Sequence, residues 1–247
     1  MDKNNKIAIV DYRMDEKIIK QLNHYCSKII MTRPHPNLME PVNGHPDMVM
    51  MQYDNWTLVV CPEEYEYYLG KFAGKGIRVI KGTNRLNRVY PLDIPYNAVR
   101  VENAIIHHGA YTDGMVVKRA TMDKLVRLDV KQGYTKCSVI NMQNHGIITA
   151  DKQIAKIAKD YGIDTLLISA GNVGLNGFDY GFIGGASGYH NGRLFLTGTL
   201  DHHPDCNNIK DFIRSKGLQV VHLSNNPIYD YGTLIILNGR ENEESIY

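Results

Sequence analysis

The sequence lacks the features that mark several large classes of protein. Its 247 residues hold 4 cysteines, 28 Lys+Arg against 26 Asp+Glu, and no apolar run near the length of a membrane helix. The nearly balanced charge argues against electrostatic binding to nucleic acid, which needs a basic excess to contact phosphates. A hydrophobic content of 43% excludes a disordered chain. We expect a globular protein with no nucleic-acid and no membrane partner.

The cysteines are too few and too scattered for a disulfide framework. Cys26, Cys61, Cys137 and Cys206 show no close pairing, which favours free thiols in a reducing compartment. The first apolar run, residues 7–10, is too short for the core of a signal peptide. The sequence therefore predicts a soluble, cytoplasmic protein.

A strand–strand–helix–strand unit recurs along the chain, and no low-complexity segment or linker interrupts it. The clearest copy combines strands at 133–140, 147–149 and 165–168 with an amphipathic helix that starts at Asp151. Repetition at about 40 to 50 residues indicates a repeat architecture, which we place in a single domain over residues 1–247. The predicted complete units span 44–80, 95–130, 133–168 and 180–223.

A fifth unit is split between the two ends of the chain. Residues 228–237 supply only a first strand, and residues 6–31 supply the missing strand, helix and strand. One unit completed from both termini predicts a closed ring, because closure leaves no unpaired sheet edge. The alternative is an open α/β sheet. We predict the ring, an α/β five-bladed ββαβ propeller, with first strands at 47–51, 97–101, 133–140, 182–187 and 232–237.

Such a ring resembles the pentein fold. That superfamily includes arginine and agmatine deiminases, dimethylarginine hydrolases, amidinotransferases and a non-enzymatic ribosome-assembly initiation factor. Gly44–Met50, GHPDMVM, is similar to the Gly-Gly-Asp-hydrophobic strand start of these enzymes, and Gly181–Gly188, GFIGGASG, resembles an uncharacterised bacterial branch. The resemblance implies an active site in the central channel, which the first strands line.

The resemblance also implies a nucleophilic cysteine on the last blade, where this sequence departs from it. The corresponding segment, Asp230–Leu237, contains no cysteine. Cys137, on a predicted first strand, is the alternative nucleophile, and His45 with Asp47 is similar to the superfamily's His-x-Asp acid/base motif. We predict that Cys137 attacks, His45 transfers the proton and Asp47 binds a cationic group, in a site that lowers the thiol pKa. Alternatively, Cys137 is a small buried residue and Asp47 caps a turn.

Substrate-binding residues are predicted around the same channel. The small residues of Gly181–Gly188 allow either close approach of a ligand to the backbone or convergence of five strands on a narrow axis. Two arginines of a long inter-blade loop could bind an anion, although a solvated charged loop is more common. The predicted set is Tyr180, Gly185, Ser187, Asp230, Arg85 and Arg88.

One segment, Asp201–Cys206 (DHHPDC), has the composition of a metal site. Adjacent histidines seldom reach one ion, and Pro204 and Asp205 fit the first turn of a helix, so we predict no metal and no cofactor.

The sequence leaves two function classes open. The first is a Cys-dependent hydrolase or transferase acting on a small guanidine- or amidine-like compound. The alternative is a non-catalytic propeller that binds a small molecule or a protein partner. A metal-dependent enzyme using His202, His203 and Asp205 is a distant third, and no feature indicates the oligomeric state.

Overall fold

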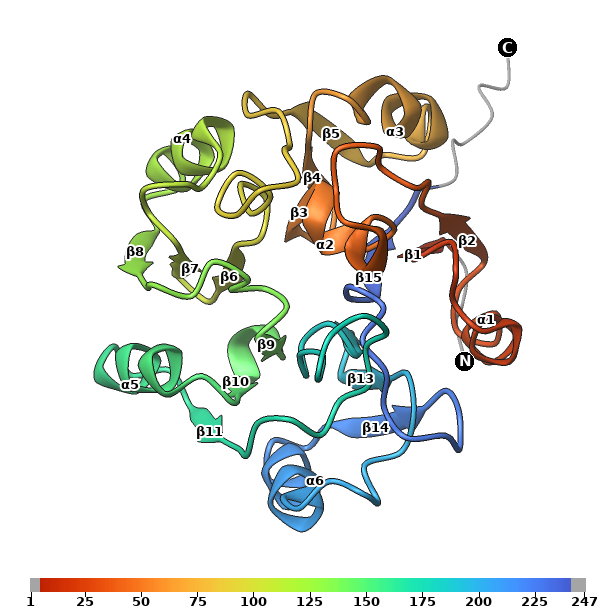
Figure 1. Cartoon of the computed structure of the whole chain (residues 1–247), viewed down its shortest axis with the longest axis vertical. Coiled ribbons are helices and arrows are strands. Elements are labelled where there is room, and N and C mark those ends of the chain that lie inside the picture. Colours follow the sequence, from red (N-terminus) through yellow and green to blue (C-terminus); the bar gives the residue numbers. More distant parts are fainter. Residues whose placement is uncertain (1–4, 241–247) are drawn as a thin grey trace.

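Five three-stranded sheets surround a central axis (Figure 1). The structure is a computed structural model, and it describes residues 5–240, so the ends of the predicted 1–247 domain lie outside the described residues. In every sheet the first strand runs antiparallel to the second, and the second runs parallel to the third through a helix. The predicted five-bladed ring is confirmed, and the open α/β sheet is wrong.

The blades follow one another around the ring in chain order. The split blade consists of β15 (Ile235–Asn238), β1 (Lys6–Val10), α1 (Glu16–Leu22) and β2 (Lys28–Met31). The second blade consists of β3 (Met50–Asp54), β4 (Thr57–Val60), α3 (Tyr65–Phe72) and β5 (Arg78–Lys81). The third consists of β6 (Val99–Val101), β7 (Ala104–His107), α4 (Gly114–Met122) and β8 (Val126–Asp129). The fourth blade consists of β9 (Val139–Asn141), β10 (Ile147–Thr149), α5 (Lys152–Asp160) and β11 (Thr165–Leu167). The fifth consists of β12 (Ser187–His190), β13 (Arg193–Leu196), α6 (Cys206–Ser215) and β14 (Gln219–His222).

Local sequence signals explain where several helices begin. Asp15, Asp113 and Asp151 each accept a hydrogen bond from a backbone N–H in the first turn of α1, α4 and α5, because a carboxylate satisfies the free donors at a helix start. The middle strands β4, β7 and β10 are buried along their whole length, as their aliphatic sequences predict. No helix in the described range 5–240 is long and apolar enough to span a bilayer.

The split blade closes the ring. β15 pairs antiparallel with β1, with Ile7 opposite Leu237 and Ile9 opposite Ile235, so the two ends of the chain share one sheet (Figure 1). Successive residues from Leu234 to Leu237 point alternately into two different hydrophobic cores. Leu234 and Ile236 pack with the buried face of α1, whereas Ile235 and Leu237 join the core that extends to β3 and β4.

All five first strands begin later than the sequence predicts. A turn, coil or short helix comes before each one; α2 (Pro46–Val49), for example, occupies the predicted start of β3. At the axis five chain segments converge, and their backbone groups bond across to other blades instead of extending the ladders. Residues 133–138 are accordingly turn and bend, so strand alternation does not decide which way the side chains of Lys136 and Cys137 point.

Ring closure by β15 can be tested through Ile236, which is 1% exposed. We expect Ile236→Ala to lower the free energy of unfolding by about 2–5 kcal/mol, because it leaves a cavity where the two chain ends meet. Val126→Ala, at an exposed position of β8, is the control and should cost less than about 1 kcal/mol. Urea denaturation measures both, and equal effects would contradict the closed ring.

Candidate active site

The segments that precede the first strands form a closed ring of hydrogen bonds at the axis, to which every blade contributes. Each bond joins one blade to the next, so the ring holds the blades in register around the channel. Its members are Asp47 N–H to Gly232 O (3.1 Å), Asn97 Nδ2 to Asp47 O (3.1 Å), Lys136 N–H to Asn97 Oδ1 (2.6 Å), Gly185 N–H to Cys137 O (3.0 Å) and Thr233 N–H to Gly185 O (2.8 Å).

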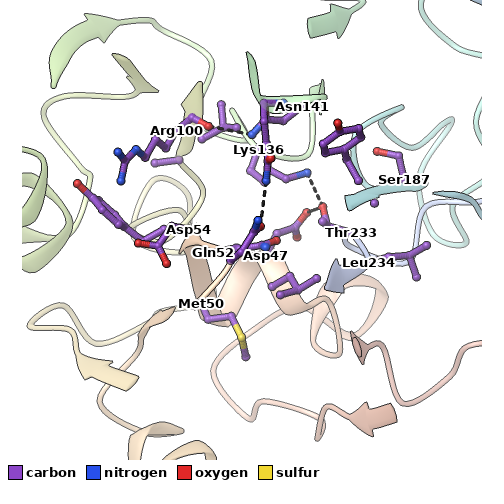
Figure 2. Close-up of a pocket in the computed structure, with 18 of the residues that line it drawn as sticks. Asp47, Met50, Gln52, Asp54, Arg100, Lys136, Asn141, Ser187, Thr233 and Leu234 are labelled. Carbon is purple, nitrogen blue, oxygen red and sulfur yellow. Dashed lines mark hydrogen bonds between the residues drawn. The ribbon is translucent and has the colours of Figure 1, made fainter. Parts of the chain in front are cut away.

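Three polar side chains point toward one another inside this ring (Figure 2). Lys136 Nζ donates to Thr233 Oγ1 at 2.9 Å, and Thr233 Oγ1 donates to Asp47 Oδ2 at 2.6 Å. Thr233 has a φ of 75°, a left-handed conformation that is strained for a β-branched residue. Such strain persists where the surroundings impose it, as they do at functional sites. The arrangement holds a hydroxyl between the side-chain nitrogen of Lys136 and the carboxylate of Asp47.

Burial sets the electrostatics of this group. Desolvation lowers the pKa of Lys136, against the opposing charges of Asp47 and Asp230. Desolvation also raises the pKa of Asp230. The second carboxylate oxygen of Asp47, Oδ1, is buried without a hydrogen-bond partner. A buried carboxylate oxygen with no donor is an energetic cost that a ligand N–H would remove.

Two cavities approach the axis. One, of about 220 Å³, follows the first strands and is lined by Asp47, Lys136 and Thr233 together with polar residues such as Gln52 and Asp54 (Figure 2). The other, of about 390 Å³, is lined by Asp11, Arg13, His45, Tyr229, Asp230 and Tyr231, among others. Both are large enough for a small organic molecule.

His45 lies between two buried carboxylates in the larger cavity. Its Nδ1 is 3.7 Å from Asp230 Oδ1, and its Nε2 is 3.9 Å from Asp11 Oδ2. Asp230 is held by the N–H groups of Phe182 and Gly232, and its side chain fills the space that a Cβ on Gly185 would need. The close approach to Asp230 is therefore why a glycine occupies position 185.

Cys137 lies in surroundings unlike those predicted for a nucleophile. Its Sγ accepts a hydrogen bond from Asn97 Nδ2 at 3.0 Å, and the residue is 3% exposed. Burial, followed by the charges of Asp47 and Asp230, raises its pKa well above the ordinary value, so the sulfur is a thiol. Cys137 lies beside the Asp47 side chain. Asp47 and His45, however, line different cavities, and Cys137 lines none of the three cavities identified in residues 5–240. The catalytic trio stays a prediction that this geometry does not favour.

The predicted binding residues are dispersed. Gly185 and Asp230 lie at the axis, and Ser187, 2% exposed, lines the smaller cavity but donates its hydroxyl to Gly184 O. Tyr180 is 46% exposed and lines a separate hollow beside Phe182. The two arginines are exposed and line none of the three cavities; Arg85 instead faces Glu63 at 3.8 Å, and the same loop carries Arg88.

The segment Asp201–Cys206 leads into α6, which begins at Cys206. Pro204 and Asp205 therefore precede the helix instead of forming its first turn as predicted, and Asp205 is the N-cap residue. Asp205 accepts a hydrogen bond from Ser169 N–H, and its own N–H donates to Nδ1 of His203. His202 is exposed. The described residues place a group of possible metal ligands elsewhere, at His35, Cys61 and Glu63. The sequence alone does not indicate this group, because the loop that carries His35 is distant in sequence from Cys61 and Glu63.

The sequence pattern also does not indicate that Lys136, Thr233 and Asn97 meet at the axis. The available signal was the position of Thr233 in Asp230–Leu237, the segment where the resemblance implies a nucleophile. Nothing in the pattern of residues 133–140 indicated that Lys136 turns toward the axis, because a strand was expected there.

One protein-family model covers most of this chain. A model described as "Family of unknown function (DUF6873)" matches residues 9–235. The chain belongs to this family. A search of the curated proteins finds no match.

Solved structures show that this member of the family has the pentein fold. Dimethylarginine dimethylaminohydrolase from Pseudomonas aeruginosa, a cysteine-to-serine mutant complexed with citrulline, superposes with a TM-score of 0.54 at 11% identity, covering 94% of this chain and 97% of that chain. SxtG, an amidinotransferase from Microseira wollei in the saxitoxin biosynthetic pathway, gives a TM-score of 0.53 at 10% identity over 96% of this chain and 94% of that chain. The predicted pentein-type propeller is thus confirmed.

Thiol labelling can test the state of Cys137. We expect iodoacetamide at neutral pH to modify Cys206, which is partly buried, well before the buried Cys26, Cys61 and Cys137. Mass spectrometry of peptides from native and urea-unfolded protein gives the rate at each site. Preferential labelling of Cys137 in the native protein, lost in His45→Ala, would instead support the catalytic trio.

Proposed function

We propose that this protein is a hydrolase or transferase that acts on a small amidine- or guanidine-type cation in the cavity along the first strands. The proposal rests on one arrangement: Lys136 Nζ lies 2.9 Å from Thr233 Oγ1, next to Oδ1 of Asp47, which is buried without a hydrogen-bond partner. Thr233 is the nucleophile, Lys136 the general base and Asp47 the binding group for the cation.

The structural neighbours support this substrate class. One is named as a dimethylarginine dimethylaminohydrolase complexed with citrulline, and another as an amidinotransferase. At 10–11% identity they share the fold alone with this chain, so the choice of reacting groups depends on its own residues.

Asp47 suits the recognition of a planar cation. Its Oδ2 is engaged by Thr233, whereas Oδ1 is free to accept an N–H from an amidinium. The resulting charge-assisted hydrogen bond is stronger than one between neutral groups. A cation bound there also disfavours the protonated form of Lys136, since like charges repel, and this prepares the base.

The chemistry needs a deprotonated hydroxyl. Neutral Lys136 takes the proton of Thr233 as Oγ1 attacks the amidine carbon, and the C–N bond to the leaving amine breaks as that nitrogen takes a proton back. Water, or an acceptor amine in a transferase, then attacks the same carbon. It gives a proton to Lys136, which passes that proton to Oγ1 of Thr233 as the C–O bond to the threonine breaks, so both side chains return to their starting states. The pKa of Lys136, lowered by burial, favours the neutral form that this base requires.

A non-catalytic binding protein is the second candidate. It is favoured by the saturated hydrogen bonding of Thr233, whose hydroxyl accepts from Lys136 and donates to Asp47 while 2% exposed. Such a network also serves to neutralise buried charge. The two candidates differ in whether a bound amidine is consumed.

A panel of amidines and guanidines, followed by ammonia or amine release, tests the proposal. For a compound that turns over, we expect Thr233→Val and Lys136→Met each to reduce kcat/KM by about 100- to 10,000-fold, whereas Thr233→Ser retains turnover. Thr57→Val, at a buried threonine of β4, is the matched control and should leave the rate unchanged. Full turnover by Thr233→Val would contradict the enzymatic proposal. So would a parent protein that binds compounds of the panel but turns none of them over.

The pH dependence of kcat/KM gives a further prediction. The rate should rise with pH through the lowered pKa of Lys136, below the ordinary 10.5, because the neutral amine is the active form. Lys136→Met should remove this rise from any residual activity. A profile that falls over the same range would show that the protonated lysine is required.

A further inference from the structure

A cluster of metal-binding side chains lies apart from the three cavities, where the loop after β2 meets the end of β4. The ligand atoms of His35, Cys61 and Glu63 all lie within 4.8 Å of one another. His35 is 1% and Cys61 0% exposed, and Glu63 is partly buried. We propose that these three side chains form a zinc site.

The cluster contains buried polar atoms that nothing in the fold satisfies. Nε2 of His35 and both carboxylate oxygens of Glu63 are buried without a hydrogen-bond partner. The hydroxyl of Tyr68, also unpartnered, lies near enough to Cys61 for its charge to influence the pKa of Tyr68. Unpartnered buried groups cost free energy, and several of them in one place indicate that a partner is missing. A metal ion and its bound water would supply that partner.

The chemistry of the donor set selects the ion. Sulfur, imidazole nitrogen and carboxylate oxygen are the three kinds of ligand that zinc takes in proteins, whereas calcium and magnesium prefer oxygen alone. Three protein ligands leave one position of a tetrahedron for water. Glu63 is the partly exposed member of the cluster, so the ion and the water enter from its side.

The arginine side chains nearby leave the carboxylate of Glu63 available to a metal ion. Arg33 binds the adjacent Glu64 at 2.8 Å. Arg85 is 3.8 Å from Glu63, but its side chain is 80% exposed and can turn into solvent without cost to packing. A divalent ion therefore competes with one loosely held guanidinium.

Metal binding requires two changes of protonation. Zinc displaces the thiol proton of Cys61, so one proton is released and affinity increases with pH. Asn37 N–H donates to Nδ1 of His35 at 3.2 Å. A metal on Nε2 requires the ring proton on Nδ1, so this long hydrogen bond is lost when the metal binds.

Cobalt titration and zinc analysis test the site in the full chain. Every protein carries Cys206→Ser, which removes the one partly exposed thiol. We expect about one zinc per chain after purification without chelator and, for cobalt, a thiolate-to-metal charge-transfer band. Cys61→Ser should abolish the band, and Glu63→Gln should weaken cobalt binding by about tenfold or more.

Matched controls separate the site from general effects. Cys26→Ser removes a buried thiol outside the cluster, and Glu66→Gln removes an exposed carboxylate of α3; both should bind cobalt as the parent does. Thr233→Val should also retain the band, which distinguishes this site from the proposed amidine chemistry. Absence of the band in the parent, or its persistence in Cys61→Ser, would overturn the proposal.

Discussion

The hydrogen-bonded ring at the axis is the constraint on which the rest of the structure depends. Each blade is a three-stranded sheet with one helix, and its first strand is only three to five residues long. The bonds from Asp47 to Gly232 and from Gly185 to Cys137 join blades that adjacent β-ladders do not connect. Closure of the ring therefore determines how far every first strand can extend before its backbone must turn and bond sideways.

The same convergence concentrates charge in a place with little water. Lys136, Asp47 and Asp230 are brought together by turns that satisfy the backbone, and desolvation then shifts the pKa of the lysine down and that of Asp230 up. Replacement of a buried ionic group by apolar residues is often neutral or stabilising in other proteins. Stability by itself thus does not require a lysine, a threonine and an aspartate at the axis, which agrees with a role toward a ligand.

Much of the fold was predictable because it depends on local periodicity. The alternation of β-branched strands with helices capped by Asp113 and Asp151, and the orphan strand near residue 235, led directly to a closed ring. The site was less predictable. Cys137 was placed in the channel by assuming an extended strand from residue 133 to residue 140, whereas residues 133–138 are turn and bend, so Lys136 and not the thiol reaches the smaller cavity.

The sequence by itself determined the five units, their strand–strand–helix–strand order and the joining of the two chain ends, since hydrophobic spacing and capping act over a few residues. The tertiary structure alone decided which polar groups meet. Lys136 and Thr233, or His35 and Cys61, are brought together by the packing of different segments, and their protonation depends on burial and on charges from other blades. No pattern within one segment encodes this burial and these charges, because they arise only once the ring has closed.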